Sequence, residues 1–340
     1  MFDFGAFPRP FIIAEMSGNH NQSLDRALEI VRAAAHCGVQ ALKLQTYTAD
    51  TITMKGAMTI DDEKSLWKGK ELYQLYQEAY TPWEWHKPIF ELANELGMVA
   101  FSSPFDESAV DFLEELGVPL YKIASFENTH HPLLRKVAQT GKPIIMSTGV
   151  ASIEEIEESV EVLKQAGCVD LTLLKCTSTY PATPANTNLV TIPYLKQKFG
   201  CRIGLSDHTM GIGVSVSAVG LGAEVIEKHF TLRRADGGVD SAFSMEPQEM
   251  AQLVKECQSA QLALGHIQLE VQTNEEKNRL FKRSIYVAAD IAQGSPLNEH
   301  NLKIIRPALG LAPRHYIHVL GKKARRDLKA GQPLQETDFE

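Results

Sequence analysis

The sequence contains no long apolar run, no cysteine pair in a C-x-x-C spacing and no extended block of basic residues. Its first apolar run, residues 11–14, is far too short for a signal peptide or a membrane span. The five cysteines are an odd number, which favours a reducing compartment over a disulfide framework. We therefore expect a cytoplasmic protein without a membrane partner.

Positive charge is also scarcer than negative charge. The chain has 34 Lys and Arg against 42 Asp and Glu, a net charge of −8. Its one basic cluster, residues 322–326, is better explained as a solvated surface than as a nucleic-acid patch, so no nucleic-acid partner is expected. With 340 residues, of which 44% are hydrophobic, the chain is long enough for a barrel and a small additional domain.

Short apolar runs alternate with amphipathic stretches of helical period. Repeated strand–helix units indicate a parallel sheet, and eight of them predict a closed (β/α)8 TIM barrel. The alternative is an open doubly wound sheet, and the absence of G-x-G-x-x-G after the first strand favours the barrel. The predicted strands are residues 11–15, 41–45, 98–102, 120–123, 143–147, 171–175, 202–205 and 225–229. The helical patterns include residues 24–37, 83–96, 109–116, 153–166, 211–221 and 247–265.

Two segments depart from this rhythm. Residues 50–77 are an insertion after the second strand, of the kind that covers a site. Beyond residue 265 the strand–helix pattern stops, and DIAQGSPLNE at 290–299 is echoed by DLKAGQPLQE at 327–336. We expect a barrel domain over residues 1–265, a linker over 266–280 and a small pseudo-symmetric domain over 281–340.

Polar residues occur at the C-terminal ends of the predicted strands, where barrel enzymes carry their chemistry. Lys43 and Lys122 stand within strands, and an unpaired buried ammonium group is costly. Two such lysines at one mouth require anionic partners, and the nearby Ser/Thr-Gly turns offer N–H groups suited to phosphate. We favour a phosphate-bearing substrate over internal Glu–Lys pairing.

His208 and His229 lie just after the seventh strand and within the eighth, so neighbouring strands can bring their imidazoles together. Two histidines with carboxylates and water nearby suit Mn²⁺, Co²⁺ or Zn²⁺. Their spacing is not a local motif, so from the residues alone a metal site and two ordinary hydrogen-bonded histidines are equally open.

A series of motifs lies at the ends of the predicted strands. They are IAEMSGNH at 13–20, LKLQT at 42–46, FSSPF at 101–105, YKIASFE at 121–127, STG at 147–149, CTSTYP at 176–181, GLSDHT at 204–209 and EKHF at 227–230. Taken in order, these motifs resemble those of the sialic acid synthase family. The resemblance covers essentially the whole chain, and the tail is similar to that family's antifreeze-like (SAF) domain.

Within the family, residues 66–73 with 81–86, residues 122–127 and residues 240–244 resemble the pseudaminic acid branch. Ser178 stands where sialic acid synthases commonly have Asn. The resemblance implies a transferase that condenses phosphoenolpyruvate with 2,4-diacetamido-2,4,6-trideoxy-β-L-altrose and water, giving pseudaminic acid and phosphate. Alternatives are an N-acetylneuraminate or legionaminate synthase, a deoxy-heptulosonate or deoxy-octulosonate phosphate synthase, and a non-catalytic carbohydrate-binding barrel.

The resemblance also implies roles for individual residues. The catalytic residues that it implies are Glu15, Glu127, His208 and His229. Of these, the two histidines are implied to hold a divalent metal ion, with Mn²⁺ favoured and Mg²⁺ or Co²⁺ as alternatives. Phosphoenolpyruvate is bound by Lys43, Ser103, Lys122, Ser125, Ser147 and Ser206. The sugar is bound by Gln45, Ser178, Tyr180, Asp240 and Arg306. Arg306 is expected to come from the partner subunit of a homodimer that exchanges its SAF domains.

Overall fold

The computed structural model describes residues 2–63 and 66–340 and separates into two compact units that divide after Gly265. Within the described residues no helix is long and apolar enough to cross a membrane.

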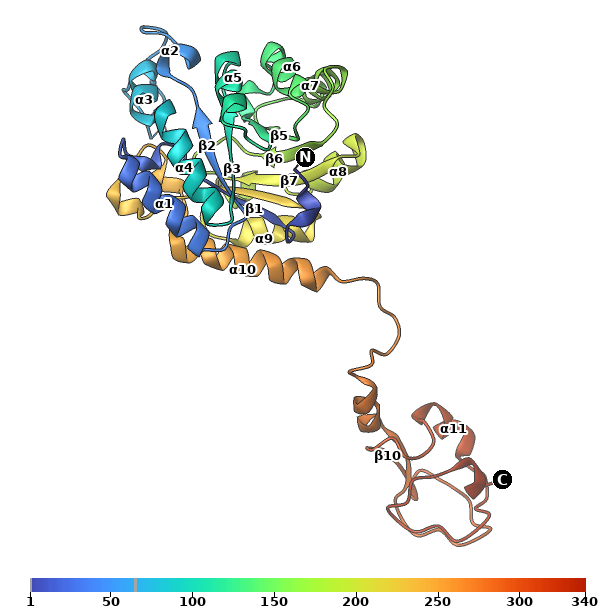
Figure 1. The fold of residues 1–340 in the computed structure, drawn as a ribbon. Helices are drawn as coiled ribbons and strands as arrows, with labels where there is room; N and C mark the ends of the chain where they lie inside the picture. The colour runs from blue at the N-terminus through green and yellow to red at the C-terminus, as the bar shows by residue number, and fades with distance from the viewer. Residues whose placement is uncertain (1, 64–65) are drawn as a thin grey trace. The chain divides into compact units, whose positions relative to one another are not determined.

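Eight parallel strands close into a barrel in the first unit (Figure 1). β1 pairs with β2 on one side and with β8 on the other, which closes the sheet and excludes the open doubly wound alternative. The prediction of a TIM barrel is therefore confirmed. The strands are β1 Phe11–Glu15, β2 Ala41–Thr46, β3 Val99–Pro104, β4 Tyr121–Ile123, β5 Ile144–Ser147, β6 Leu171–Cys176, β7 Arg202–Asp207 and β8 Val225–His229.

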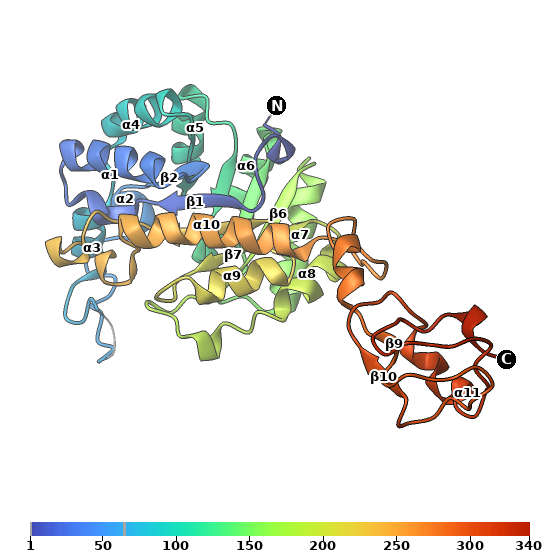
Figure 2. The same ribbon diagram turned by 90° about the horizontal axis from the view of Figure 1, so that it is seen from below.

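Helices surround the barrel, and α10 runs between α1 and α9 (Figure 2). Their starts follow local sequence signals: the side chain of Ser23 caps α1, and Ser152 with Glu155 forms a capping box on α7. The helices α6 and α8 were not named from the sequence, and both are only nine residues long. The surrounding helices are α1 Leu24–His36, α4 Trp83–Glu95, α5 Glu107–Glu115, α6 His131–Gln139, α7 Ile153–Gln165, α8 Thr191–Phe199, α9 Gly213–Gly220 and α10 Pro247–Leu264.

The insertion after β2 contains two short helices, α2 Ala49–Ile52 and α3 Leu72–Ala79. The Tyr73 hydroxyl donates to the Asp50 carboxylate at 3.0 Å and ties the two helices together. The hydrogen bond therefore joins the start of the insertion to its end.

The barrel interior is layered because side chains alternate between the two faces of each strand. A lower layer is apolar, and Gly204 completes it where β7 passes β8. Its side chains are Ile13, Ala41, Phe101, Leu120, Ile145, Leu174 and Val225. Two residues further along each strand comes a buried layer that contains two lysines and two glutamates, here called the polar layer. It consists of Glu15, Lys43, Ser103, Lys122, Ser147, Cys176, Ser206 and Glu227.

The second unit contains an antiparallel pair of strands, β9 Ser284–Val287 and β10 Leu302–Ile305, and the short helix α11 Tyr316–Val319. The two halves of the sequence repeat pair with each other: Ile291 and Leu328 exchange backbone hydrogen bonds of 2.9 and 2.8 Å. The repeat therefore builds a small core of its own, which includes Ile285, Leu297 and Leu334.

Candidate active site at the barrel mouth

The polar layer is an ion-pair network around Glu227. Lys43 Nζ lies 2.5 Å from Glu15 and 3.8 Å from Glu227, and Lys122 Nζ lies 3.9 Å from Glu227. The internal Glu–Lys pairing that we considered less favourable is therefore present. The two lysines and two carboxylates balance each other in a site that is almost fully buried.

Serine hydroxyls accompany each lysine. Lys122 donates to Ser147 at 2.7 Å, and Lys43 donates to Ser103 at 3.3 Å. Ser206 donates to Glu227 at 3.2 Å. Ser125 lies beside Gly149, two residues beyond Ser147. A Cβ placed on Gly149 would be 2.7 Å from the Ser125 Oγ. The residues expected to bind phosphoenolpyruvate thus lie together, with hydroxyl and ammonium donors at the polar layer.

The charges of this layer shift each other's pKa. Burial disfavours ionisation of Glu227, but Lys122 and Lys43 outweigh it and lower the pKa of that carboxyl group. For Glu15 burial prevails over Lys43 and raises its pKa, and for Lys122 burial prevails over Glu227 and lowers its pKa. Of the two carboxyl groups in the layer, Glu15 is therefore the one that more readily takes a proton.

The layer above contains the two histidines, whose ring centres are 5.4 Å apart. His208 Nδ1 lies 3.0 Å from the Thr177 carbonyl, so its Nε2 is the nitrogen left for another partner. His229 Nδ1 is buried without a hydrogen bond in the described part of the chain, and lies 3.7 Å from the Asp240 carboxylate. Burial, followed by the charge of His208, holds the pKa of His229 well below its ordinary value.

Burial keeps His229 neutral, which is the form of imidazole that binds metal, and the carboxylate of Asp240 is adjacent, so His229 fits a divalent cation. Burial also disfavours protonation of His208, but Cys176 and the Thr177 carbonyl outweigh it and raise the pKa, so a metal bound there would displace a proton. Within residues 2–63 and 66–340, no group of three His, Cys, Asp or Glu side chains is set to hold a metal ion. A cation held here by His208 and His229 would therefore take its other ligands from water or substrate.

Of the residues expected to bind sugar, Asp240 and Tyr180 lie beside the histidines. Ser17 donates to Asp240, and Gln45 donates to Glu15 at 3.0 Å. The Tyr180 ring lies 4.6 Å from that of His208. Ser178 belongs to the same wall, since its Oγ lies 3.6 Å from the Cys176 sulfur. Arg306 lies in the second unit, where it is exposed.

Glu127 lies beside the polar layer in a 3-10 turn, Ser125–Glu127, that follows β4. Burial raises its pKa to about 7, against the opposing effect of Lys122. One of its carboxylate oxygens is buried without a hydrogen-bond partner among the residues described. A carboxyl group that titrates near neutrality suits proton transfer.

Two further residues belong to the site but were not assigned to it from the sequence. Glu227 lies between both lysines, and Cys176 Sγ is 4.0 Å from His208 Nδ1. Burial raises the pKa of the Cys176 thiol, but the hydrogen bond and charge of His208 outweigh it and lower the pKa to about 7. Both could have been found from strand alternation. Glu227 lies two positions after Val225 of the apolar layer, and Cys176 lies two positions after Leu174, so both side chains point into the barrel.

The barrel is closed and parallel, and buried lysines, carboxylates and two histidines lie at the C-terminal ends of its strands. These features define a barrel enzyme with a charged mouth. The chain belongs to the NeuB family, which matches residues 30–269, and residues 282–340 match the SAF domain. The predicted family membership is thereby confirmed.

Relatives resemble the chain over nearly its full length. The pseudaminic acid synthase of Campylobacter jejuni is 43% identical, with 99% of both chains covered. The pseudaminic acid synthase of Helicobacter pylori is also 43% identical, over 97% of this chain and 98% of the relative. A crystal structure of the N-acetylneuraminic acid synthetase of Leptospira borgpetersenii is 35% identical, with a TM-score of 0.72, and covers 80% of this chain and 90% of its own.

Proposed function

We propose that the protein is a pseudaminic acid synthase that condenses phosphoenolpyruvate with 2,4-diacetamido-2,4,6-trideoxy-β-L-altrose and water, releasing phosphate. The observation that carries this proposal is the 43% identity to two pseudaminic acid synthases over almost the entire chain. The unpaired state of all five cysteines agrees with action in the reducing cytoplasm.

In the proposed reaction, C3 of phosphoenolpyruvate bonds to the aldehyde carbon of the open-chain sugar. Water then adds to C2, and the C2–O bond to phosphate breaks. Lys122 and Lys43, with the hydroxyls of Ser103, Ser125, Ser147 and Ser206, bind the phosphate and carboxylate of phosphoenolpyruvate. Glu15 and Glu127, whose pKa values are raised, hold or accept the protons that the water and the aldehyde oxygen exchange.

Charge balance supports a cation in the site. The two lysines of the polar layer are already matched by Glu15 and Glu227, so a polyanion requires further positive charge or protons. A divalent ion held by His208 and His229, with Mn²⁺ favoured over Mg²⁺ or Co²⁺, would supply that charge and polarise the aldehyde oxygen. Gln45, Ser178, Tyr180 and Asp240 hold the sugar around it.

Metal removal tests this assignment. We expect chelation to lower kcat by roughly two orders of magnitude or more, with recovery on adding Mn²⁺. His229→Gln should lower activity similarly and resist rescue, whereas the exposed control His300→Gln should behave as wild type. Full turnover by exhaustively chelated protein would contradict a metal requirement.

We further propose a homodimer in which each SAF domain serves the barrel of its partner. The unit 266–340 has 12 Lys and Arg against nine Asp and Glu, whereas residues 1–265 have 22 against 33. The second unit is net positive and the first is net negative, and these opposite charges favour docking of the second unit of one chain on the first unit of another. The linker carries exposed apolar side chains, Ile267, Leu269 and Val271, which suit burial against a second copy.

Phosphate release with defined sugars tests the function. Purified protein is incubated with phosphoenolpyruvate, Mn²⁺ and one of three sugars: the altrose derivative, N-acetylmannosamine or 2,4-diacetamido-2,4,6-trideoxymannose. We expect release with the altrose derivative alone. Release only with one of the other two would make the chain an N-acetylneuraminate or legionaminate synthase, and no release with any sugar would refute the synthase.

A further inference from the structure

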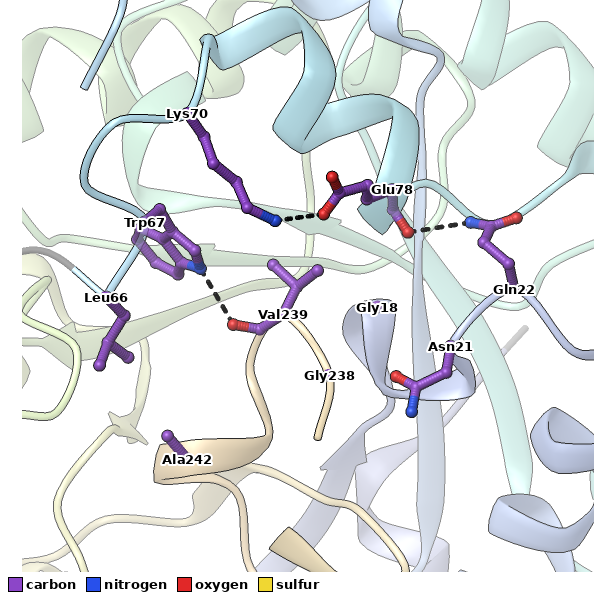
Figure 3. Close-up of a pocket in the computed structure, with 10 residues that line it drawn as sticks. All are labelled: Gly18, Asn21, Gln22, Leu66, Trp67, Lys70, Glu78, Gly238, Val239 and Ala242. Carbon is purple, nitrogen blue, oxygen red and sulfur yellow. Dashed lines mark hydrogen bonds and ion pairs between the residues drawn. The ribbon is translucent and has the colours of Figure 1, made fainter. Parts of the chain in front are cut away.

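A cavity of about 520 Å³ opens beside the barrel mouth. Three loop regions form it: residues that follow β1, the insertion after β2, and the segment between β8 and α10 (Figure 3). Its apolar side chains are Leu66, Trp67, Val239 and Ala242. The proposed reaction assigns no role to this cavity.

Trp67 connects the cavity to the catalytic residues. Its indole Nε1 donates to the Val239 carbonyl at 3.0 Å, which fixes the ring across the gap between the insertion and the segment after β8 (Figure 3). The ring also lies 6.1 Å from that of Tyr180, which contacts His208. A substrate extending from the histidines past Tyr180 would therefore meet Trp67 before it reached the cavity.

The cavity combines apolar surface with hydrogen-bonding groups. Asn21 and Gln22 use their amide NH₂ groups to bind the carbonyls of Gly237, Glu78 and Tyr80. Within the described residues, the Asn21 bond leaves its side-chain oxygen available as an acceptor, and the Lys70–Glu78 ion pair adds charged groups to the wall (Figure 3). An acetamido group has the matching composition, because its methyl group is apolar and its N–H is a donor.

We propose that Trp67 is a specificity-determining residue, against which the acetamido group at C4 of the sugar packs as it enters this cavity. The inference rests on the proposed function. The acetamido group at C2 adjoins the reacting aldehyde and stays near the histidines, whereas C4 is two carbons further from the reacting end. The enzyme thereby distinguishes a diacetamido sugar from one that carries a hydroxyl at C4.

A substrate pair tests the proposal. Wild type and Trp67→Ala are assayed with the diacetamido altrose derivative and with its 4-hydroxy analogue, 2-acetamido-2,6-dideoxy-L-altrose. We expect Trp67→Ala to lower kcat/KM for the diacetamido sugar roughly 10- to 100-fold, through sugar KM, and to change the analogue's value little. The KM for phosphoenolpyruvate should stay unchanged, and Tyr194→Ala, which truncates an exposed ring on α8, is the matched control.

The outcomes separate the two proposals. Equal losses with both sugars would show that Trp67 only supports the loop, and would overturn the inference while leaving the synthase intact. Failure of the wild type to release phosphate with the diacetamido sugar would instead remove the proposed function.

Fluorescence gives a measurement that does not depend on turnover. The chain has three tryptophans, and Trp83 and Trp85 both lie on α4. In chelated protein with phosphoenolpyruvate bound, where turnover is slow, adding the diacetamido sugar should change wild-type emission and leave Trp67→Phe nearly unchanged. A sugar-dependent change of equal size in Trp67→Phe would contradict the proposed contact.

Discussion

At the scale of single residues, the charge of the barrel interior is finely balanced. Lys43, Glu15 and Glu227 form one buried group, and Lys122 adds the second positive charge. Burial raises the pKa of Glu127 to about 7, so this side chain changes charge in the neutral range. Its ionisation adds a negative charge beside the lysines, and this opposes the binding of any anion there.

The pH dependence of phosphoenolpyruvate binding follows from this titration. Below pH 7 the Glu127 carboxyl group is protonated and neutral, and above pH 7 it is ionised and repels the ligand. We expect the ratio of the wild-type Kd to that of Glu127→Gln to rise with pH through about 7, because the ligand's own ionisation cancels in the ratio. Calorimetry at several pH values measures it.

Glu95→Gln, a change of the same kind at an exposed position, should keep a ratio near one at every pH. A pH-independent ratio for Glu127→Gln would show that Glu127 does not sense the bound anion.

At the scale of elements, the apolar layer depends on one close approach between strands. A Cβ on Gly204 of β7 would lie 2.3 Å from the Val225 carbonyl oxygen of β8 and 2.6 Å from a Leu174 methyl group. The carbonyl belongs to the β7–β8 ladder and cannot move without breaking it. Glycine at this position therefore lets the barrel close.

We expect Gly204→Ala to lower the free energy of unfolding by about 1–3 kcal/mol, measured by urea denaturation. Gly213→Ala is the matched control, because nothing lies within 4 Å of a Cβ at this helical position, where alanine is the better helix former. If both variants were equally stable, the close approach at Gly204 would not constrain the barrel.

Short apolar runs and helical patterns predicted most of these elements, because buried strands and amphipathic helices both leave a local signal in the sequence. The same patterns did not single out α6 and α8, although α5 has the same length and was predicted. Neither α6 nor α8 begins with a side-chain cap, so the local signal for a helix start is weak. Glu227 lies within a predicted strand and Cys176 just after one, and neither was assigned to the site from the sequence. Their roles depend on which strands become neighbours, and that is decided only when the barrel closes.

At the scale of the whole molecule, the proposed exchange of SAF domains makes each active site the product of two chains. Arg306 and His229 then act in the same site but come from different subunits. Neither residue can compensate for loss of the other within one chain, so inactive variants should complement each other only if the exchange occurs.

Mixed dimers test this arrangement. Arg306→Ala should sharply raise sugar KM without unfolding the protein, and His229→Gln should be inactive. Refolding the two together in equal amounts should restore about a quarter of wild-type activity, because half the dimers are mixed and each has one complete site. No recovery in confirmed mixed dimers, or an active monomer, would contradict the exchange.

The apolar layer beneath the polar layer leaves the barrel open to small molecules at one end only. On the proposed assignment the deeper position belongs to phosphoenolpyruvate and the shallower one to the sugar. A bound sugar would block the entry of phosphoenolpyruvate, so phosphoenolpyruvate should bind first and the sugar second. For the same reason, phosphate should be the last product to leave. Inorganic phosphate should then compete with phosphoenolpyruvate but not with the sugar, a pattern that product-inhibition kinetics distinguishes from random binding.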